Sequence, residues 1–207
     1  MKLYYSPGAC SMNPHILAQE AGIKLDLVKV DLQNKTLEDG SDFTKINPKG
    51  YVPALQLDDG SLITENVAID LYLAGLKPEK NLAPKQGSPE FLEFFQSLLF
   101  ITTEIHKGMG GLFAPLSDEA KEVLKKKLRT RLTFLAEQLK GKQFVFDDRF
   151  TAADAYLFTV LNWAPKVKVD LAEWSALVDY QKRIGARPAV QAAMQAEGLP
   201  VPTAKAA

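Results

Sequence analysis

The chain has 207 residues, and 25 lysine and arginine residues balance 25 aspartate and glutamate residues, so its formal net charge is zero. Hydrophobic residues make up 46% of the sequence, which excludes a disordered chain, and the lack of excess positive charge gives no support to a nucleic-acid binder. A chain of this length forms one large domain or two small ones.

Strand and helix patterns alternate in the first third of the chain. Strands are predicted at residues 2–5, 25–30, 53–57 and from 62 onward, the last two joined by a hairpin turn at Asp59-Gly60. Helices are predicted from Ser11 to a stop at Gly22, and after Thr64, which can cap the second helix. Residues 43–46 form a short helical or irregular piece. The predicted order is βαβ followed by ββα.

The rest of the chain has a helical pattern. Residues 77–88 are polar and punctuated by prolines, which predicts a linker between a first domain at 1–76 and an all-helical domain at 89–207. Thr151 and Asp154 match a capping box ahead of an apolar helix. The first helix after the linker carries an apolar face made of Phe91, Phe95, Leu98, Thr102 and Ile105. Further helices are predicted at 119–139, 173–184 and 188–196.

Cys10 is the only cysteine, which rules out an internal disulfide and a cysteine zinc cluster and favours a reducing compartment. The two histidines form no H-x-x-x-H pattern, so no metal site is expected. The first ten residues lack the apolar stretch of a signal peptide, and no window approaches about 18 consecutive apolar residues. We therefore expect a cytoplasmic protein without a membrane span.

The place of Cys10 in the chain suggests chemistry, because it follows a strand and a Pro-Gly turn and precedes a helix. A thiol at a helix N-terminus feels the helix dipole and unpaired backbone N–H groups, which favour the reactive thiolate. The alternative is a small buried apolar side chain. Asn13 stands where a dithiol oxidoreductase would carry its second cysteine, so only single-thiol chemistry is open.

Two further signals flank the third strand. Proline at position 53 has no N–H group to donate to a neighbouring strand. A cis Val52–Pro53 bond would turn the backbone of Val52 outward, where it could pair with an extended peptide. The alternative is an ordinary proline in an edge strand. Thr64-Glu65-Asn66 leads into a helix N-terminus, where free N–H groups attract a carboxylate and Glu65 could bind an ammonium group. This arrangement suits the zwitterionic end of an amino acid, although ordinary helix capping explains the same residues.

The two histidines have plain structural explanations. His106 and Lys107 precede a glycine-rich stretch, and cationic residues at a helix end are explained by C-capping. His15 lies within the first helix, where a structural role is expected. The sequence contains no glycine-rich nucleotide motif and no serine-hydrolase elbow.

These features occur together, and in order, in a known family. The segments KLYYSPGACS, INPKGYVPALQLDDG, ITENVAIDLYL, EIHKG and FTAADAYLFTVLNWAP resemble the cytosolic glutathione transferases. The closest resemblance is to the bacterial beta class, in which a cysteine stands where other classes use tyrosine or serine. It covers essentially the whole chain and implies an α/β thioredoxin-like N-terminal domain, with a cis-proline before the third strand, followed by an all-α domain.

The resemblance also implies residue roles. Cys10 would lie beside the glutathione sulfur and form a mixed disulfide with it, while His106 and Lys107 would approach the thiol from the helical domain. Asp154 would be structural. The residues implied in glutathione binding are Lys35 at the glycine carboxylate, Val52 with its backbone on the cysteinyl part beside Pro53, Glu65 and Asn66 at the γ-glutamyl end, and Tyr51.

A homodimer is implied as well, with Thr103 and Glu104 of the partner subunit near the γ-glutamyl group. Leu99 stands where relatives usually carry asparagine, and Asn66 stands where serine or glycine is usual; both differences bear on glutathione affinity. The predicted lining of an electrophile pocket is Phe113, Tyr156, Trp163 and Lys166.

The sequence therefore predicts a glutathione transferase that conjugates glutathione to electrophilic substrates, exchanges thiols through Cys10, or does both. Two alternatives stay open. One is a non-catalytic binding module of the same fold, since a fold does not guarantee a function. The other is a glutathione-dependent dehalogenase or isomerase. Glutathione would be the cosubstrate, with a small hydrophobic electrophile as partner and no metal.

Overall fold

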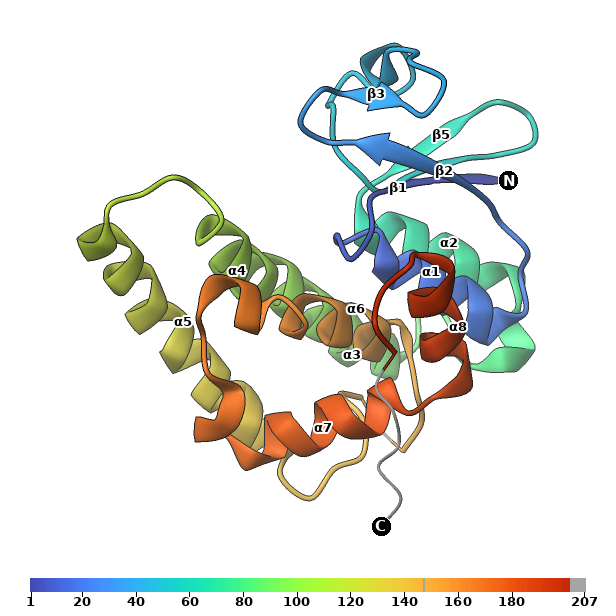
Figure 1. Ribbon diagram of the computed structural model, residues 1–207. Coiled ribbons are helices and arrows are strands. Elements are labelled where there is room, and N and C mark those ends of the chain that lie inside the picture. Colours follow the sequence, from blue (N-terminus) through green and yellow to red (C-terminus); the bar gives the residue numbers. More distant parts are fainter. Residues whose placement is uncertain (147, 202–207) are drawn as a thin grey trace. The chain divides into compact units, whose positions relative to one another are not determined.

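The computed structural model describes residues 1–146 and 148–201, which separate into two compact units. The sheet unit comprises Met1–Ala83 together with the described residues from Ala186 onward, and the helical unit comprises Pro84–Gly185 (Figure 1). Within the described ranges, none of the helices combines the length and the apolar character that crossing a bilayer requires.

Five strands form one mixed sheet in the sheet unit. They are β1 (Lys2–Tyr5), β2 (Asp26–Asp31), β3 (Thr36–Leu37), β4 (Ala54–Gln56) and β5 (Leu62–Thr64), and their order in the sheet is β3-β2-β1-β4-β5. β1 runs parallel to β2 and antiparallel to β4, with Leu3 opposite both Leu27 and Leu55. This confirms the thioredoxin-like order. The sequence did not predict β3, because two residues are too few to show an alternating pattern.

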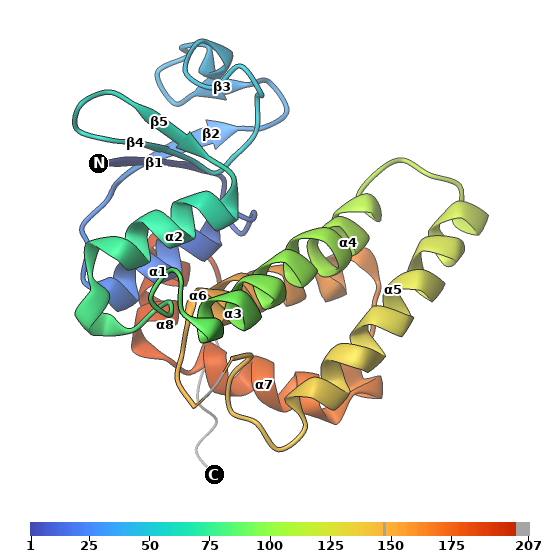
Figure 2. The same cartoon turned by 180° about the vertical axis from the view of Figure 1, so that it is seen from behind.

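Two helices of the sheet unit, α1 (Met12–Ala21) and α2 (Asn66–Leu76), pack against each other and lie side by side next to the sheet (Figures 1 and 2). Gly22, with φ 68°, ends α1 as predicted. A separate apolar cluster includes Phe43 of the 3₁₀ turn Phe43–Lys45 and Val52, which precedes β4. This cluster anchors the segment that carries the Val52–Pro53 bond.

The position of α8 (Pro188–Ala196) differs from the predicted domain boundaries, which assigned it to the helical domain. It packs against α1 in the sheet unit. Arg187 forms a bidentate ion pair with Glu20, with N–O distances of 2.6 and 3.0 Å, and Glu197 pairs with the buried His15 at 3.0 Å. The amphipathic pattern of a helix shows that one face is buried but not which element covers that face, so the sequence did not predict the contact between α8 and α1.

Two predicted helix caps are wrong. The Ser11 hydroxyl does not cap α1 but accepts a hydrogen bond from the Ser6 N–H at 3.1 Å. Thr64 ends β5, and the N-cap of α2 is Glu65. The Thr64 hydroxyl instead accepts a hydrogen bond from the Lys49 ammonium at 2.9 Å. In both cases the hydroxyl accepts a hydrogen bond from a donor outside the helix instead of from a backbone N–H of the first helical turn.

The helical unit begins with a continuous rod in which α3 (Pro89–Phe100) is followed by a π-helical segment (Ile101–His106) and α4 (Lys107–Gly111) (Figure 2). Its other helices are α5 (Asp118–Leu139), α6 (Ala152–Leu161) and α7 (Ser175–Gly185). Every residue of α6 is buried, so α6 forms the centre of this core. The buried residues of the rod are Phe94, Leu98, Ile101, Ile105 and Met109.

The apolar face predicted for the rod is therefore partly wrong. Leu98 and Ile105 are buried as expected, but Phe91, Phe95 and Thr102 are only half-buried. Phe91 and Phe95 stack on each other, with ring centroids 5.7 Å apart. Two apolar stripes run along the same helix, and packing of α3 against α6 selects the one that contains Phe94.

Asp154 connects three parts of the helical unit, and its capping box with Thr151 is confirmed. The fully buried carboxylate accepts hydrogen bonds from the Thr151 N–H (2.9 Å), the Thr151 hydroxyl (3.1 Å), the Val145 N–H (2.8 Å) and the Tyr180 hydroxyl (3.0 Å). Burial raises the pKa of Asp154 to about 6, opposed by these hydrogen bonds. The carboxylate thus ties α6 to α7 and to the loop before α6.

Candidate functional site

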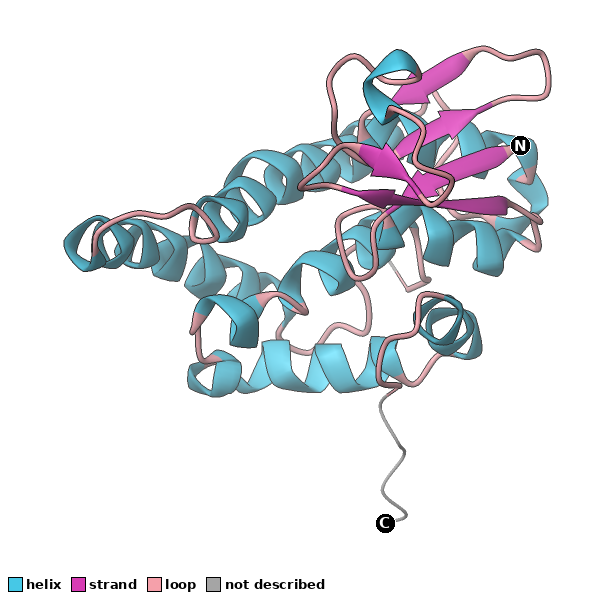
Figure 3. Cartoon of the chain, turned by 45° about the horizontal axis from the view of Figure 1, so that its top comes forward, coloured by secondary structure: helices cyan, strands magenta, loops and turns pink. Residues whose placement is uncertain are grey.

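Cys10 lies in the loop between β1 and α1 and is half-buried. Its thiol donates a hydrogen bond to the carbonyl oxygen of Val52, with an Sγ–O distance of 3.2 Å. The Val52–Pro53 peptide bond is cis, as predicted. β1 and β4 are antiparallel neighbours in a sheet whose strands lie side by side in Figure 3, so the loop that follows β1 lies next to the segment that precedes β4.

Hydrogen bonds at both ends of the Cys10 loop hold it in place. The Ser6 N–H donates to the Ser11 hydroxyl at 3.1 Å, which spans the loop from one end to the other. The Gly8 N–H donates to Glu197 Oε2 at 2.8 Å, and the other carboxylate oxygen of Glu197 is 3.0 Å from His15 Nδ1. His15 therefore has the structural role expected of it. Glu197 follows α8, so the C-terminal part of the sheet unit helps to position the loop.

Glu65 stands where β5 meets α2 and has a backbone φ of 74°, a conformation that is uncommon for glutamate and often found at functional sites. Its Oε1 accepts hydrogen bonds from the Lys49 ammonium at 2.6 Å and from the Tyr51 hydroxyl at 2.7 Å. The hydrogen bond to Glu65 raises the pKa of both Lys49 and Tyr51. This carboxylate therefore already holds an ammonium group, the kind of group that the sequence predicted for it.

Asn66 and Lys35 were also predicted to bind a ligand. Asn66 begins α2 and is buried, and its Oδ1 accepts a hydrogen bond from Asn13 Nδ2 at 3.2 Å. Lys35 has a left-handed backbone conformation, with φ 57°, between β2 and β3. Its side-chain methylenes pass close to Gly50, the residue before Tyr51, since a Cβ atom at Gly50 would lie 3.6 Å from Lys35 Cδ. The predicted residues of the sheet unit thus gather around Gly50–Pro53 and the start of α2.

The helical unit brings four other predicted residues into one aromatic cluster. His106 Nδ1 is 2.6 Å from the Tyr156 hydroxyl, and the His106 ring packs edge-on against Trp163 with centroids 5.0 Å apart. Phe113 extends the cluster, with its ring 5.8 Å from that of Trp163. Lys166 is exposed on the 3₁₀ turn Ala164–Val167 and makes no hydrogen bond to this cluster within the described residues.

The remaining predicted residues line two grooves of the helical unit. Thr103, Glu104 and Lys107 border a groove of about 490 Å³ that α5 closes from the other side. Glu104 forms an ion pair there with Arg131. Leu99, which is 42% exposed, borders a different groove of about 520 Å³ together with Phe100 and Phe134. Leu99 and Thr103 are therefore not parts of the same groove wall.

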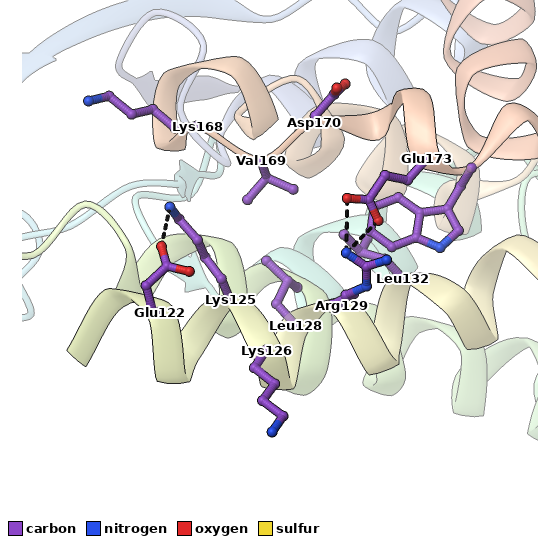
Figure 4. A pocket seen from close by; sticks show the side chains of 11 residues that line it. Glu122, Lys125, Lys126, Leu128, Arg129, Leu132, Lys168, Val169, Asp170 and Glu173 are labelled. Atoms are coloured by element: carbon purple, nitrogen blue, oxygen red, sulfur yellow. Dashed lines mark hydrogen bonds and ion pairs between the residues drawn. The ribbon is translucent and has the colours of Figure 1, made fainter. Parts of the chain in front are cut away.

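A third groove, of about 310 Å³, contains none of the predicted residues (Figure 4). It lies between α5 and residues 168–174, and the Trp174 indole forms part of its wall. Two ion pairs cross or border it: Arg129 with Glu173 at 2.8 Å, and Lys125 with Glu122 at 2.8 Å. Much of the charge in this groove is therefore paired within the protein.

Sequence reasoning missed Lys49, Asn13 and Asp70. Lys49 was part of the segment INPKGYVPALQLDDG, but nothing in the sequence places its ammonium group against Glu65, 16 positions away. Asp70 had a visible signal, because a carboxylate interrupts the apolar run of α2. Within residues 1–146 and 148–201, no three His, Cys, Asp or Glu side chains are grouped so that they could hold a metal ion.

Comparison with known proteins agrees with this arrangement. The model of the glutathione S-transferase N-terminal domain matches residues 1–75, and the model of the C-terminal domain matches residues 100–188. The chain is 46% identical over 200 residues to glutathione S-transferase GstA of Escherichia coli O157:H7, an alignment that covers 96% of this chain and all of that protein.

Two solved structures are similar over nearly the full length. The bacterial beta class glutathione S-transferase of Sphingomonas chungbukensis is 44% identical, with a TM-score of 0.93, and covers 97% of this chain and 100% of its own. A sphingomonad glutathione S-transferase complexed with glutathione is also 44% identical, with a TM-score of 0.92 and the same coverage. The resemblance to the beta class is thereby confirmed, and the chain belongs to the glutathione S-transferase family.

Proposed function

We propose that this family member uses glutathione as its cosubstrate and transfers it to electrophilic substrates, exchanges it with disulfides through Cys10, or does both. The observation that carries the proposal is the 3.2 Å contact between the Cys10 thiol and the carbonyl oxygen of Val52. A tripeptide that pairs its backbone with Val52 would bring its own sulfur to Cys10, because both groups belong to one small surface of the sheet unit. The similar sphingomonad structure, which is complexed with glutathione, supports this.

The neighbouring side chains match the two ends of glutathione. Glu65 would exchange its internal ammonium partner, Lys49, for the α-ammonium group of the γ-glutamyl residue. The N-terminus of α2 at Asn66 would receive the α-carboxylate, since helix N-termini favour anions. Lys35, whose side chain passes close to Gly50, and Tyr51, the residue after Gly50, would bind the remaining part of the tripeptide, with Lys35 at the glycine carboxylate.

Two reactions would use this site. In conjugation, the glutathione thiolate attacks an electrophilic carbon, a carbon–sulfur bond forms, and the leaving group departs with its electron pair. In exchange, the Cys10 thiolate attacks glutathione disulfide, a Cys10–glutathione disulfide forms, and one glutathione thiolate leaves. The thiolate of a second substrate then attacks the mixed disulfide, takes over the glutathionyl group and releases the Cys10 thiolate. Both reactions depend on one bound tripeptide but differ in their need for Cys10.

Several roles stay predictions of the family resemblance. These include the action of His106 and Lys107 on the thiol, the contribution of Thr103 and Glu104 of the partner subunit, the homodimer itself and a cytoplasmic location. The electrophile pocket is such a prediction as well: Tyr156 and Trp163 are buried, and Phe113, which packs on Trp163 and is 53% exposed, offers its ring to solvent.

Replacing Glu65 with glutamine tests the site. The substitution keeps the shape of the side chain but removes the charge that would pair with the γ-glutamyl ammonium group, so the Kd for glutathione should rise about tenfold or more in titration calorimetry. Glu79→Gln is the matched control, because Glu79 is exposed on the turn Pro78–Lys80 of the same unit. Unchanged affinity in Glu65→Gln would remove Glu65 from the site.

Calorimetry combined with activity assays separates the alternative functions. Binding of glutathione without conjugation of a general electrophile or disulfide exchange would favour a non-catalytic binding module. Release of halide, or rearrangement of a substrate without net consumption of glutathione, would favour a dehalogenase or an isomerase. Absence of glutathione binding in the unmodified protein would contradict the proposal.

A further inference from the structure

Three polar side chains are buried together where α1 meets the first turn of α2. Asn13 and Asp70 are fully buried, and Asn66 is 7% exposed. Asn13 Nδ2 donates one hydrogen bond to Asn66 Oδ1 at 3.2 Å and another to Asp70 Oδ2 at 2.7 Å. One amide therefore uses both of its N–H donors to join an asparagine and a carboxyl group that lie one helical turn apart.

Two oxygen atoms of this group have no hydrogen-bond partner in the described part of the chain. They are Asn13 Oδ1 and Asp70 Oδ1, and both are buried. If Asp70 were ionised, two acceptors and a negative charge would stay uncompensated in the interior, which is costly. One proton removes both problems. A proton on Asp70 Oδ1 can be donated to Asn13 Oδ1, so that the planar carboxyl and amide groups share two antiparallel hydrogen bonds.

Among the residues that the structure describes, no cation stabilises an ionised Asp70. The elements that pack against α2 are α1, β5 and the turn Pro78–Lys80. On α1, His15 pairs with Glu197 and Glu20 pairs with Arg187, while Glu79 and Lys80 of the turn are exposed; Tyr72 is the other titratable residue of α2. Burial raises the pKa of Asp70 well above its ordinary value, opposed only by the hydrogen bond from Asn13. The neutral acid is the form that fits these surroundings.

The neutral acid determines how Asn66 is oriented. A carboxamide can turn over and exchange its oxygen and nitrogen with little change in shape. Here Asn13 Nδ2 donates to Asn66, so the Asn66 atom that faces Asn13 must be the oxygen Oδ1. The two N–H donors of the Asn66 carboxamide therefore lie on the side away from Asn13. Asn66 is the first residue of α2, directly after Glu65, where an anionic ligand group would meet hydrogen-bond donors.

We propose that Asp70, carrying a proton and acting through Asn13, is a positioning residue that holds the Asn66 carboxamide with its N–H donors toward the α-carboxylate of the γ-glutamyl group. This inference rests on the proposed function, because it assumes that glutathione occupies the site. It adds a buried acid and an amide, neither of which touches the ligand, to the residues that set glutathione affinity.

Two substitutions at position 70 separate positioning from packing. Asp70→Asn is neutral and can both donate to Asn13 and accept from it, so it reproduces the protonated acid. Asp70→Val has similar size but can do neither, and it frees Asn13 and Asn66 to turn. We expect the glutathione Kd of Asp70→Asn to stay within about twofold of the unmodified protein, and that of Asp70→Val to rise about tenfold. Thermal unfolding would verify that both variants are folded.

A double-mutant cycle with Asn66→Ala tests whether Asp70 acts through Asn66. If it does, Asp70→Val should weaken glutathione binding in the Asn66 background and have little further effect in the Asn66→Ala background. Full additivity of the two substitutions would overturn the proposal, because Asp70 would then act independently of Asn66. Unchanged affinity in a folded Asp70→Val protein would overturn it too.

Infrared spectroscopy examines the proton without glutathione. At neutral pH, the difference spectrum between the unmodified protein and Asp70→Asn should contain the carbonyl band of a protonated carboxyl group, while the contribution of Asp154 is the same in both proteins and cancels. Absence of the band would overturn the acid–amide pair. A band together with no glutathione binding would overturn the positioning role along with the proposed function and leave the acid–amide pair supported. The two failures are thereby distinguished.

Discussion

Replacing Asp154 with alanine is expected to lower the free energy of unfolding of the helical unit by about 3–5 kcal/mol, a large share of the stability of an ordinary domain. The carboxylate accepts four hydrogen bonds in a fully buried position. Alanine leaves these donors without an acceptor, and each unsatisfied buried donor costs about 1–3 kcal/mol before the structure relaxes. The link between α6 and α7 through Tyr180 is lost as well.

Chemical denaturation followed by circular dichroism would measure this loss. Asp179→Ala is a suitable control, because Asp179 lies on α7 of the same unit, is 67% exposed, and should change the free energy of unfolding by less than about 0.5 kcal/mol. A loss below about 1 kcal/mol in Asp154→Ala would mean that the surrounding backbone finds other hydrogen-bond partners, contrary to our expectation.

The cost of Asp154→Ala should also depend on pH. Because the pKa of Asp154 is raised from 3.8 to about 6 in the folded protein, folding takes up a proton between these values. The stabilisation that comes from this proton is fully present below pH about 4 and is lost as the pH rises through about 6. The loss of stability caused by the substitution should therefore be larger at pH 4 than at pH 7.

Replacing Cys10 with alanine is expected to abolish the covalent adduct that forms with oxidised glutathione. Cys10 is the only cysteine, so its thiolate is the only sulfur nucleophile able to displace glutathione from its disulfide. Intact-mass spectrometry of the unmodified protein should show one added glutathione per chain, and a thiol reductant should remove it. The Cys10→Ala protein should keep its original mass under both conditions.

The comparison between the two proteins decides between the two reactions proposed. An adduct of the same mass on Cys10→Ala would contradict the assignment of the thiol. An unmodified protein that binds glutathione but forms no adduct would show that Cys10 is shielded, and conjugation by the bound tripeptide would then be the main reaction. Glu79→Gln, which leaves the Cys10 loop untouched, should form the adduct as the unmodified protein does.

Local patterns in the sequence were sufficient for much of the fold. The strand and helix order of the first domain, the stop at Gly22 and the capping box at Thr151 and Asp154 depend on residues within a few positions of one another. The cis Val52–Pro53 bond and the turn that carries Cys10 were predicted in the same way. The family followed from these segments and their order, because long motifs in a fixed arrangement are specific even where each motif is not.

The tertiary structure decided which distant residues meet. The Glu197 carboxylate accepts a hydrogen bond from the Gly8 N–H, 189 positions away, and the Glu65 carboxylate accepts one from the Lys49 ammonium group. Asn13 joins Asn66 and Asp70, more than 50 positions further along the chain. Such pairs have no periodic signature, since they depend on how helices and strands pack and on which buried polar groups must satisfy one another. The sequence by itself thus determined the elements and the family of this protein, whereas packing alone decided the partners that hold Cys10, Glu65 and Asn66 in place.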